Sequence, residues 1–414
     1  METIQKERNY TIEFVRIMFA VNFIIVHVLM VFPIGFLRGF PLFLAGLDTI
    51  IPFMAFAGFF MMQGFKKQQA AAERYGLSPG HQAGNYLKAR LIGLLPVFLL
   101  AQLMGFFANN IWLDTPISQW PIRLLNAIGE LTGVQITGIG FGNASVGVWG
   151  EGIRVHQLFN TPLWFISGIF VAGYIIYYLL AKNEKSFIGI IAPVSILIFY
   201  GSQYLDGRNP MWFEIGRIGD FNIPLGFIHM FVGLSIGCLI YVAVDKLKGK
   251  EFSRGMIAFM TIAQIILMTI VIVRTWAPVT SPIAQYFNMG WGSVHVLTFF
   301  FSFFVLLNVD KCTRFPLFSG RIWRIPGRMA FYMYMLHFPI IVFCAMLMGF
   351  KGTLLTPQTV STVAPRLTIL LVVTIVTTII LAYIVMTIDM KVLQPWLKSQ
   401  PWFRKEQSEI STEA

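Results

Sequence analysis

Long runs of apolar residues, separated by shorter polar segments, occupy most of the chain. A helix rises 1.5 Å per residue, so about twenty residues cross the roughly 30 Å of hydrocarbon in a bilayer. Runs of this length predict ten transmembrane helices, at residues 12–32, 48–65, 87–107, 161–181, 187–204, 223–244, 255–275, 291–309, 328–349 and 367–388. Apolar and polar residues do not alternate as they would in strands, so the pattern favours a helical bundle over a barrel.

The composition supports this interpretation. Of the 414 residues, 56% are hydrophobic and 12% are charged, and so few charges would not cover a soluble protein of this length. The sequence therefore predicts an all-α integral membrane protein, folded as a single domain over residues 1–414 with its core at about 10–390. A long outer loop is expected at residues 108–160, and a short cytoplasmic tail is expected at residues 390–414.

The 31 Lys and Arg residues are spread unevenly over the predicted loops. Most of them fall in segments that are inner segments if the N-terminus is inside, such as residues 66–90, 245–254 and 310–328. Positive charge is retained on the cytoplasmic side of a membrane, so this asymmetry predicts cytoplasmic N- and C-termini. The net charge of +12 is then explained by topology and by attraction to anionic lipid, and it does not indicate a nucleic-acid partner.

The first predicted span carries ionisable side chains where lipid makes them costly. Arg16 and His27 are eleven residues apart, close to three helical turns, so they share a face and lie about 16 Å apart along the axis. Taken singly, Arg16 is typical of a snorkelling residue at a helix end and His27 of a hydrogen-bonded core histidine. The shared face favours a joint role. Glu13, three residues before Arg16, is expected to pair with it.

The Arg-x10-His pattern and four later motifs resemble those of the membrane-bound acyltransferase family 3. The later motifs follow in the family's order and are IPFMAFAGFFMMQGF, YLKARLIGLLP, LWFISGIFVAGY and GRMAFYMYMLHFPI. Together the five cover the chain from about residue 10 to 390. Two positions depart from the family pattern: Ala57 replaces the usual Ser before Gly58, and Gly93 stands where many members carry the second Arg of an Arg-x-x-Arg pair that begins at Arg90.

The resemblance implies an integral-membrane O-acyltransferase that moves an acyl group, usually acetyl, from cytoplasmic acyl-CoA to a hydroxyl of an extracytoplasmic saccharide or envelope glycan. The implied partners are acetyl-CoA or another acyl-CoA as co-substrate, a saccharide or lipid-linked glycan acceptor and the lipid bilayer, with no metal. The expected location is the cell membrane, as a multi-pass protein of a bacterial cytoplasmic membrane. The sequence does not specify the oligomeric state.

Two other classes of protein fit parts of the pattern. A polysaccharide flippase or secondary transporter would also have about ten spans with charge inside the membrane, but such folds usually show matched Gly- or Pro-interrupted helices in two halves. We find no such match in the sequence. A non-catalytic assembly or sensor protein would leave the pairing of Arg16 with His27 unexplained.

The resemblance and the charge pattern together assign roles to seven residues. Arg16, Lys88 and Arg90 lie near the predicted inner surface and are expected to hold the phosphates of CoA, because guanidinium and ammonium groups bind phosphate. His27 is expected at the far end of the donor. It would act as a general base on the acceptor hydroxyl or as the nucleophile that forms an acyl-histidine.

The late motif YMYMLHFPI adds further candidates. His337 is a second catalytic candidate, with a hydrogen bond in helix packing as its alternative role. Tyr334, one turn before His337, and Trp164, in the fourth span, are the candidates for substrate binding. His229 and His295 are isolated histidines without metal-ligand spacing and are expected to be structural.

Overall fold

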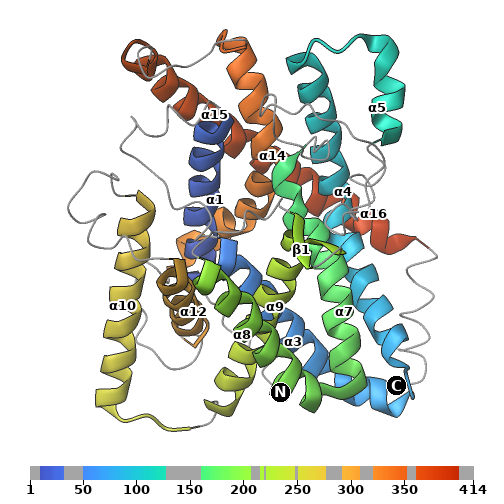
Figure 1. Cartoon of the computed structure of the whole chain (residues 1–414), viewed down its shortest axis with the longest axis vertical. Helices are drawn as coiled ribbons and strands as arrows, with labels where there is room; N and C mark the ends of the chain where they lie inside the picture. Colours follow the sequence, from blue (N-terminus) through green and yellow to red (C-terminus); the bar gives the residue numbers. More distant parts are fainter. Residues whose placement is uncertain are drawn as a thin grey trace.

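A computed structural model of the chain describes residues 10–31, 50–126, 160–206, 215–218, 221–247, 250–276, 291–307, 320–351 and 360–400. Within these ranges the protein is a bundle of long helices (Figure 1). A helix lies in each of the ten predicted spans: α1 (Tyr10–Val31), α3 (Ile50–Arg74), α4 (Pro79–Trp112), α7 (Trp164–Ser186), α8 (Ala192–Asp206), α9 (Leu225–Leu247), α10 (Arg254–Trp276), α12 (Trp291–Leu307), α14 (Arg324–Leu347) and α15 (Val360–Ile388). The helical fold class is therefore confirmed.

One small hairpin departs from the all-α prediction. Strands β1 (Ile215–Ile218) and β2 (Phe221–Pro224) pair antiparallel, with Ile215 opposite Pro224, directly before α9. The remaining described elements are short helical turns: η2 (Ile117–Gln119), α5 (Trp120–Asn126), η4 (Thr161–Leu163), η5 (Phe187–Ile191), η6 (Arg321–Trp323), η7 (Asp389–Leu393) and α16 (Gln394–Ser399). The elements η5 and η7 are π-helical, so each continues a neighbouring α-helix with a wider turn.

Six helical stretches in the described ranges are long and apolar enough to cross a membrane. They are Tyr10–Val28, Pro79–Trp112, Trp164–Gly201, Gly226–Leu247, Arg321–Leu347 and Pro365–Ser399. The third of these contains non-helical backbone at Asn183, with φ −161° and ψ 90°, and α7 and α8 run in different directions on either side of it (Figure 1). The helices are those of a membrane protein, whereas the count of ten crossings and the cytoplasmic termini stay predictions.

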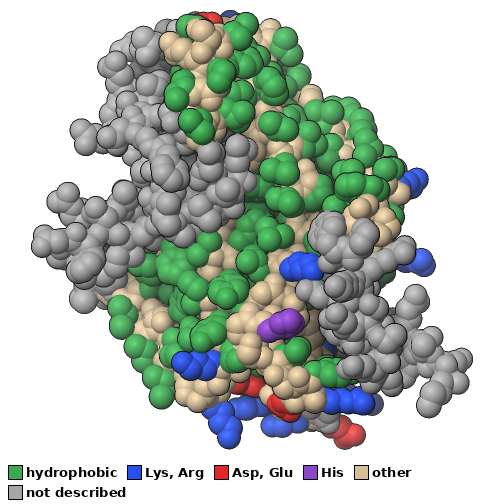
Figure 2. Space-filling view, turned by 90° about the vertical axis from the view of Figure 1, so that its right-hand side faces the viewer, with side chains coloured by type: hydrophobic (Ala, Val, Ile, Leu, Met, Phe, Trp, Pro, Cys, Tyr) green, Lys and Arg blue, Asp and Glu red, His purple; other side chains and the backbone are tan. Residues whose placement is uncertain are grey.

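The described surface suits contact with lipid. Large exposed apolar residues recur along the outer sides of three helices: Leu95, Leu99, Leu103, Phe107 and Ile111 on α4, Phe259, Ile262 and Ile266 on α10, and Ile369, Val376, Ile380 and Ile384 on α15. The spacing of three, four and seven residues places each set in one stripe of its helix. Figure 2 shows hydrophobic side chains over much of one face, with most of its charged side chains toward the lower end.

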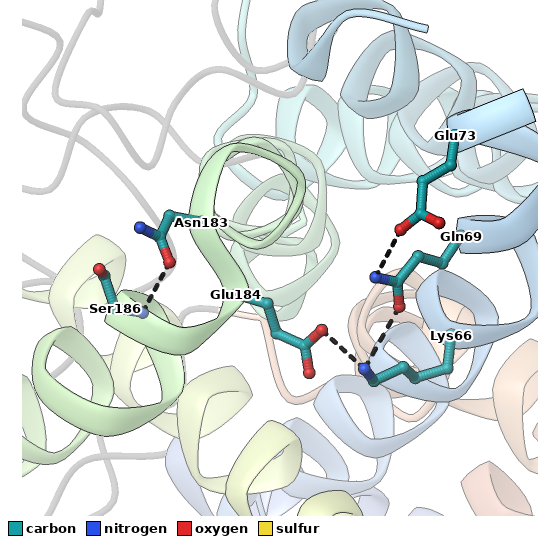
Figure 3. Close-up of polar contacts among 6 residues, drawn as sticks. All are labelled: Lys66, Gln69, Glu73, Asn183, Glu184 and Ser186. Carbon is teal, nitrogen blue, oxygen red and sulfur yellow. Dashed lines mark hydrogen bonds and ion pairs between the residues drawn. The ribbon is translucent and has the colours of Figure 1, made fainter. Parts of the chain in front are cut away.

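Three of the connections that carry Lys and Arg lie together at one end of the bundle. The turns between α3 and α4, between α7 and α8, and between α9 and α10 all lie at the lower end of Figure 1. There, Lys66 donates to Glu184 (2.6 Å) and to Gln69 (3.3 Å), and Gln69 donates to Glu73 (3.0 Å) (Figure 3). These three connections place part of the sequence's positive charge at one end of the molecule, where an ion pair ties α3 to α7.

Glycines allow two pairs of helices to approach closely. On α3 and α9, a Cβ at Gly58 would overlap the carbonyl oxygen of Leu234, and a Cβ at Gly237 would overlap that of Ala55. On α1 and α14, a Cβ at Gly327 would overlap the side chain of Glu13 and lie 2.7 Å from its Cα. Small residues at such crossings let helix backbones touch, which is a main source of helix association in membranes.

The predicted outer loop begins later than expected. Helix α4 starts at the Ser78 cap, whose Oγ accepts from the N–H of His81 (3.3 Å), and continues to Trp112 rather than ending near residue 107. The turn η2 and helix α5 follow, and α5 packs back on α4 because the ring of Trp120 lies 5.7 Å from that of Phe106. Residues 127–159 of this loop lie outside the described residues.

The predicted tail begins as helix. Helix α15 continues through η7 into α16, which ends at Ser399. The Asp389 carboxylate at this junction is buried and accepts a hydrogen bond from the hydroxyl of Tyr332 on α14 (2.7 Å). A buried carboxylate with a partner explains why the helix does not end at the polar residue that the sequence suggested. Residues 401–414 lie outside the described residues.

Candidate active site

Helices α1 and α14 bring His27 and His337 together. The two residues are 310 positions apart in the chain, yet Nε2 of His337 lies 3.2 Å from Nδ1 of His27 and the ring centroids are 4.9 Å apart. Both side chains are buried. Each was a separate candidate in the sequence, and the fold makes them one histidine pair.

Backbone carbonyls determine which ring nitrogens of the pair carry hydrogen. Nδ1 of His27 lies 2.8 Å from the carbonyl oxygen of Phe23, and Nδ1 of His337 lies 2.7 Å from that of Tyr334. A carbonyl only accepts, so in the neutral rings both Nδ1 atoms are protonated and both Nε2 atoms carry a lone pair. The single Nδ1–H of His27 is then shared between the Phe23 carbonyl, at the shorter distance, and Nε2 of His337. This assignment leaves Nε2 of His27 as the basic and nucleophilic nitrogen of that ring.

Aromatic side chains enclose the histidine pair. The ring of Phe23 meets that of Tyr334 edge-on at 5.3 Å, and Tyr334 meets Phe165 at 5.7 Å. On the other side, Phe338 lies 6.1 Å from His27 with the rings nearly perpendicular. Rings packed in this way exclude water and hold the imidazoles in fixed orientations.

A cavity of about 310 Å³ lies beside the pair, lined by residues of α1, α3, α4, α7 and α14. Along α1 it extends from Ile12 past Arg16 to Phe23, and on α14 it reaches Tyr334. Its wall is largely aromatic and includes Phe53, Phe56, Phe60, Phe165 and Phe331. The histidines themselves are not among the lining residues. Phe23 and Tyr334, whose carbonyls hold the two Nδ1–H groups, form the boundary between the cavity and the pair.

Two guanidinium groups line this cavity from different helices. Arg16 on α1 lies 3.6 Å from the carboxylate of Glu13, as the sequence predicted, and keeps a third of its side chain exposed. Arg90 on α4 lies over the ring of Tyr86, 5.4 Å from its centroid, and Tyr86 in turn stacks on Tyr177 at 4.8 Å. The cavity therefore combines a strongly basic part with an apolar, aromatic remainder.

Lys88 and Trp164, the two remaining predicted site residues, also do not line the cavity. Lys88 precedes Arg90 by two residues, so it points about 200° away around α4. Trp164 is buried and packs edge-on against Phe165, with ring centroids 6.3 Å apart. Of these two neighbours, Phe165 lines the cavity, and substrate binding by Trp164 stays a prediction.

Sequence reasoning missed several cavity residues that share a helical face with a predicted one. Tyr86 lies four residues before Arg90, and Phe23 lies four residues before His27, so the spacing of one turn was the available signal. Ala57, which replaces the usual Ser of the family motif, also lines the cavity. This replacement removes a hydroxyl from the wall.

His229 differs from the histidine pair. It is buried and its ring lies 5.2 Å from that of Phe199 on α8, so its surroundings are those of a packed core residue. The side chain of His295 lies outside the described residues. Among the residues that the structure describes, no three His, Cys, Asp or Glu side chains gather in a way that could hold a metal ion.

A buried histidine pair next to a basic cavity, within a bundle of membrane helices, is an arrangement suited to transfer chemistry on an anionic donor. Residues 9–386 match the acyltransferase domain of the acyltransferase 3 family. The match covers nearly the whole chain, so the protein belongs to this family and is a membrane acyltransferase. No curated protein and no solved structure matches the chain.

Proposed function

We propose that the protein transfers an acyl group, in the simplest case acetyl, from cytoplasmic acyl-CoA to a hydroxyl of a saccharide or lipid-linked glycan on the other side of the membrane. The observation that carries this proposal is the cavity that Arg16 and Arg90 line. It is closed by Phe23 and Tyr334, one turn from His27 and His337. The guanidinium groups that could bind an anion and the histidines that could transfer a proton therefore lie at opposite ends of the same region.

The donor site follows from the charge of the cavity. CoA is a polyanion, and two guanidinium groups on separate helices can hold its phosphates with forked hydrogen bonds. The slender pantetheine arm would then occupy the aromatic part of the cavity and bring the thioester toward Phe23. Lys88, outside the lining, would contribute only through longer-range attraction.

The reaction would use Nε2 of His27. This nitrogen takes the proton of the acceptor hydroxyl while the hydroxyl oxygen bonds to the thioester carbonyl carbon. The carbon–sulfur bond then breaks, and the proton on His27 passes to the departing CoA sulfur. Nε2 of His337 accepts the Nδ1–H of His27 and stabilises the imidazolium that forms during the step.

An acyl-histidine route uses the same nitrogen. Nε2 of His27 attacks the thioester carbonyl carbon directly, the carbon–sulfur bond breaks, and CoA leaves as the thiol with the proton from Nδ1 of His27. The oxygen of the acceptor hydroxyl then bonds to the acyl carbon as the bond to Nε2 breaks, and the hydroxyl proton returns to Nδ1. Rapid mixing with radiolabelled acetyl-CoA in the absence of acceptor separates the routes, because only this route leaves label on the protein.

The sidedness of transfer tests the proposal as a whole. Sealed proteoliposomes of known orientation would receive labelled acetyl-CoA on the predicted cytoplasmic face and a mixture of soluble oligosaccharides inside the other compartment. We expect labelled oligosaccharide when the donor is on the predicted cytoplasmic face and the acceptor is on the opposite side. We expect none when donor and acceptor are both on the extracytoplasmic face. Label only when donor and acceptor share the cytoplasmic face would contradict transfer across the membrane.

The same vesicles distinguish acyl transfer from transport. A flippase or secondary transporter would move the saccharide between compartments without acylating it. Movement of unmodified oligosaccharide, with no acyl product and no loss of acetyl-CoA, would refute the proposal and favour that alternative.

A further inference from the structure

The prolines inside α4 and α14 each leave a backbone carbonyl without its usual helical partner. Pro96 lies inside α4 and Pro339 lies inside α14. Proline has no N–H, so the carbonyl four residues earlier loses its hydrogen bond. Those carbonyls belong to Ile92 and Met335. Within a membrane such a group needs another donor, because lipid supplies none.

A side-chain amide donates to each of these carbonyls. Gln394 of α16 places Nε2 3.3 Å from the oxygen of Ile92. Asn160 places Nδ2 3.1 Å from the oxygen of Met335 and 3.3 Å from that of Ala101. The Asn160 side chain is fully buried. Both amides therefore replace a missing backbone N–H from a distant part of the chain.

The turn that Asn160 contacts is the one that carries His337. Asn160 directly precedes η4, and the carbonyl of Pro162 in η4 accepts a hydrogen bond from the Tyr334 hydroxyl. Segment 160–162 is thus attached to α14 at two successive residues, Tyr334 and Met335. The Tyr334 carbonyl in turn accepts from Nδ1–H of His337, so these bonds hold the turn and the imidazole together.

We infer that Asn160 is a positioning residue that holds His337 against His27. Pro339 removes the internal hydrogen bond that would keep the Met335 turn regular, and Asn160 restores it from outside the helix. Without that donor, the Met335 carbonyl rotates toward another partner and carries the adjacent Tyr334 carbonyl with it. This inference rests on the proposed function, because it assigns His337 to the reaction.

The first test replaces Asn160 with Leu, which has similar size but no donor. We expect kcat to fall about 10- to 100-fold, as for other small misplacements of a catalytic group. KM for acyl-CoA should be unchanged, because Arg16 and Arg90 lie on α1 and α4. A folded Asn160→Leu protein with wild-type kcat would overturn the inference.

Gln394→Leu is the matched control. It removes the same kind of amide-to-carbonyl bond at the other proline, away from the histidine pair. Both variants should lower the melting temperature in detergent, but only Asn160→Leu should lower kcat strongly. Equal losses of kcat in the two variants would mean that Asn160 acts only on stability.

A second variant tests whether Asn160 acts through the Met335 carbonyl. Pro339→Ala supplies a backbone N–H for that carbonyl, so in the double variant Asn160→Leu/Pro339→Ala the melting temperature and kcat should both recover. Recovery of the melting temperature with kcat still as low as in Asn160→Leu would overturn the inference, because Asn160 would then not act through the turn that carries His337.

Nitrogen-15 NMR of labelled histidine tests the inference independently of activity. In Asn160→Leu the ring signals of His337 should shift, while those of the exposed His81 should not. Unchanged His337 signals would overturn the inference. If these signals shift but the wild-type protein transfers no acyl group, the proposed function fails while the positioning of His337 stands.

Discussion

Two helix pairs in this molecule pack closely through glycine, but they bury different groups. Between α3 and α9, Gly58 and Gly237 let backbone meet backbone, and Cys238 Sγ lies 3.6 Å from the Gly58 carbonyl. Between α1 and α14, a single close approach at Gly327 is followed farther along by the histidine pair.

The comparison separates a scaffold from a site. The α3–α9 contact contributes packing and little chemistry, and its helices supply apolar walls such as Phe53 and Ala57 to the cavity. The α1–α14 contact carries polar groups that cost free energy to bury unless they are hydrogen-bonded. A protein keeps such groups in its interior when they serve a function. Substitutions in the α3–α9 contact should therefore lower stability, whereas substitutions in the α1–α14 contact should also lower activity.

The largest effect should follow from His27→Ala. Loss of the basic nitrogen should lower kcat by about 10²- to 10⁴-fold, the usual contribution of a general base or acid. The melting temperature should change little, because the histidine lies beside the close contact and not in it. His229→Ala, which removes a buried histidine outside the site, is the control and should retain activity. Wild-type turnover in a folded His27→Ala protein would remove His27 from the reaction.

Arg90→Ala should have the next largest effect, and it should affect only the binding of the donor, acyl-CoA. Loss of a charge-assisted hydrogen bond costs about 1.5–3 kcal/mol, so acyl-CoA binding measured by calorimetry should weaken by at least tenfold. Lys88→Ala, on the same helix but outside the cavity, should bind acyl-CoA nearly as well as the wild type. Equal weakening in both variants would place the phosphates at the helix surface and not in the cavity.

Arg16→Ala is a less direct test than Arg90→Ala. Removal of Arg16 also takes away the guanidinium group that lies 3.6 Å from the buried carboxylate of Glu13, which is destabilising in itself. The double variant Glu13→Gln/Arg16→Ala removes both charges. We expect it to recover thermal stability but not acyl-CoA affinity, and recovery of affinity would exclude Arg16 from the donor site.

The smallest expected effects compare the two glycine contacts directly. Gly58→Ala and Gly327→Ala each force a methyl group into a neighbouring helix, which typically costs about 1–3 kcal/mol of stability. Both should lower the melting temperature, but only Gly327→Ala should also lower kcat, because it moves α1 against α14. Gly64→Ala is the control on α3, since nothing lies within 4 Å of its Cβ position. A loss of kcat in Gly58→Ala equal to that in Gly327→Ala would remove the distinction between scaffold and site.

Local patterns in the sequence determined the helices and much of the first span. Hydrophobic length is a property of consecutive residues, so each of the ten runs corresponds to a helix, although α3 and α4 extend past the apolar stretch at their polar ends. The common face of Arg16 and His27 likewise follows from helical periodicity, and Arg16 and Phe23 line the cavity in that order toward His27.

Only the tertiary structure decided which distant groups meet. No periodicity links residue 27 with residue 337, and their contact depends on how α1 crosses α14 at Gly327. That Arg90 lines the cavity and Lys88 does not, and likewise Phe165 and not Trp164, depends on which side of each helix faces its neighbours. The pairing of Asn160 with the Met335 carbonyl, which Pro339 leaves without a helical partner, also depends on how distant segments pack together. Spacing along a chain determines which residues share a helical face, whereas close packing between helices determines what that face contacts.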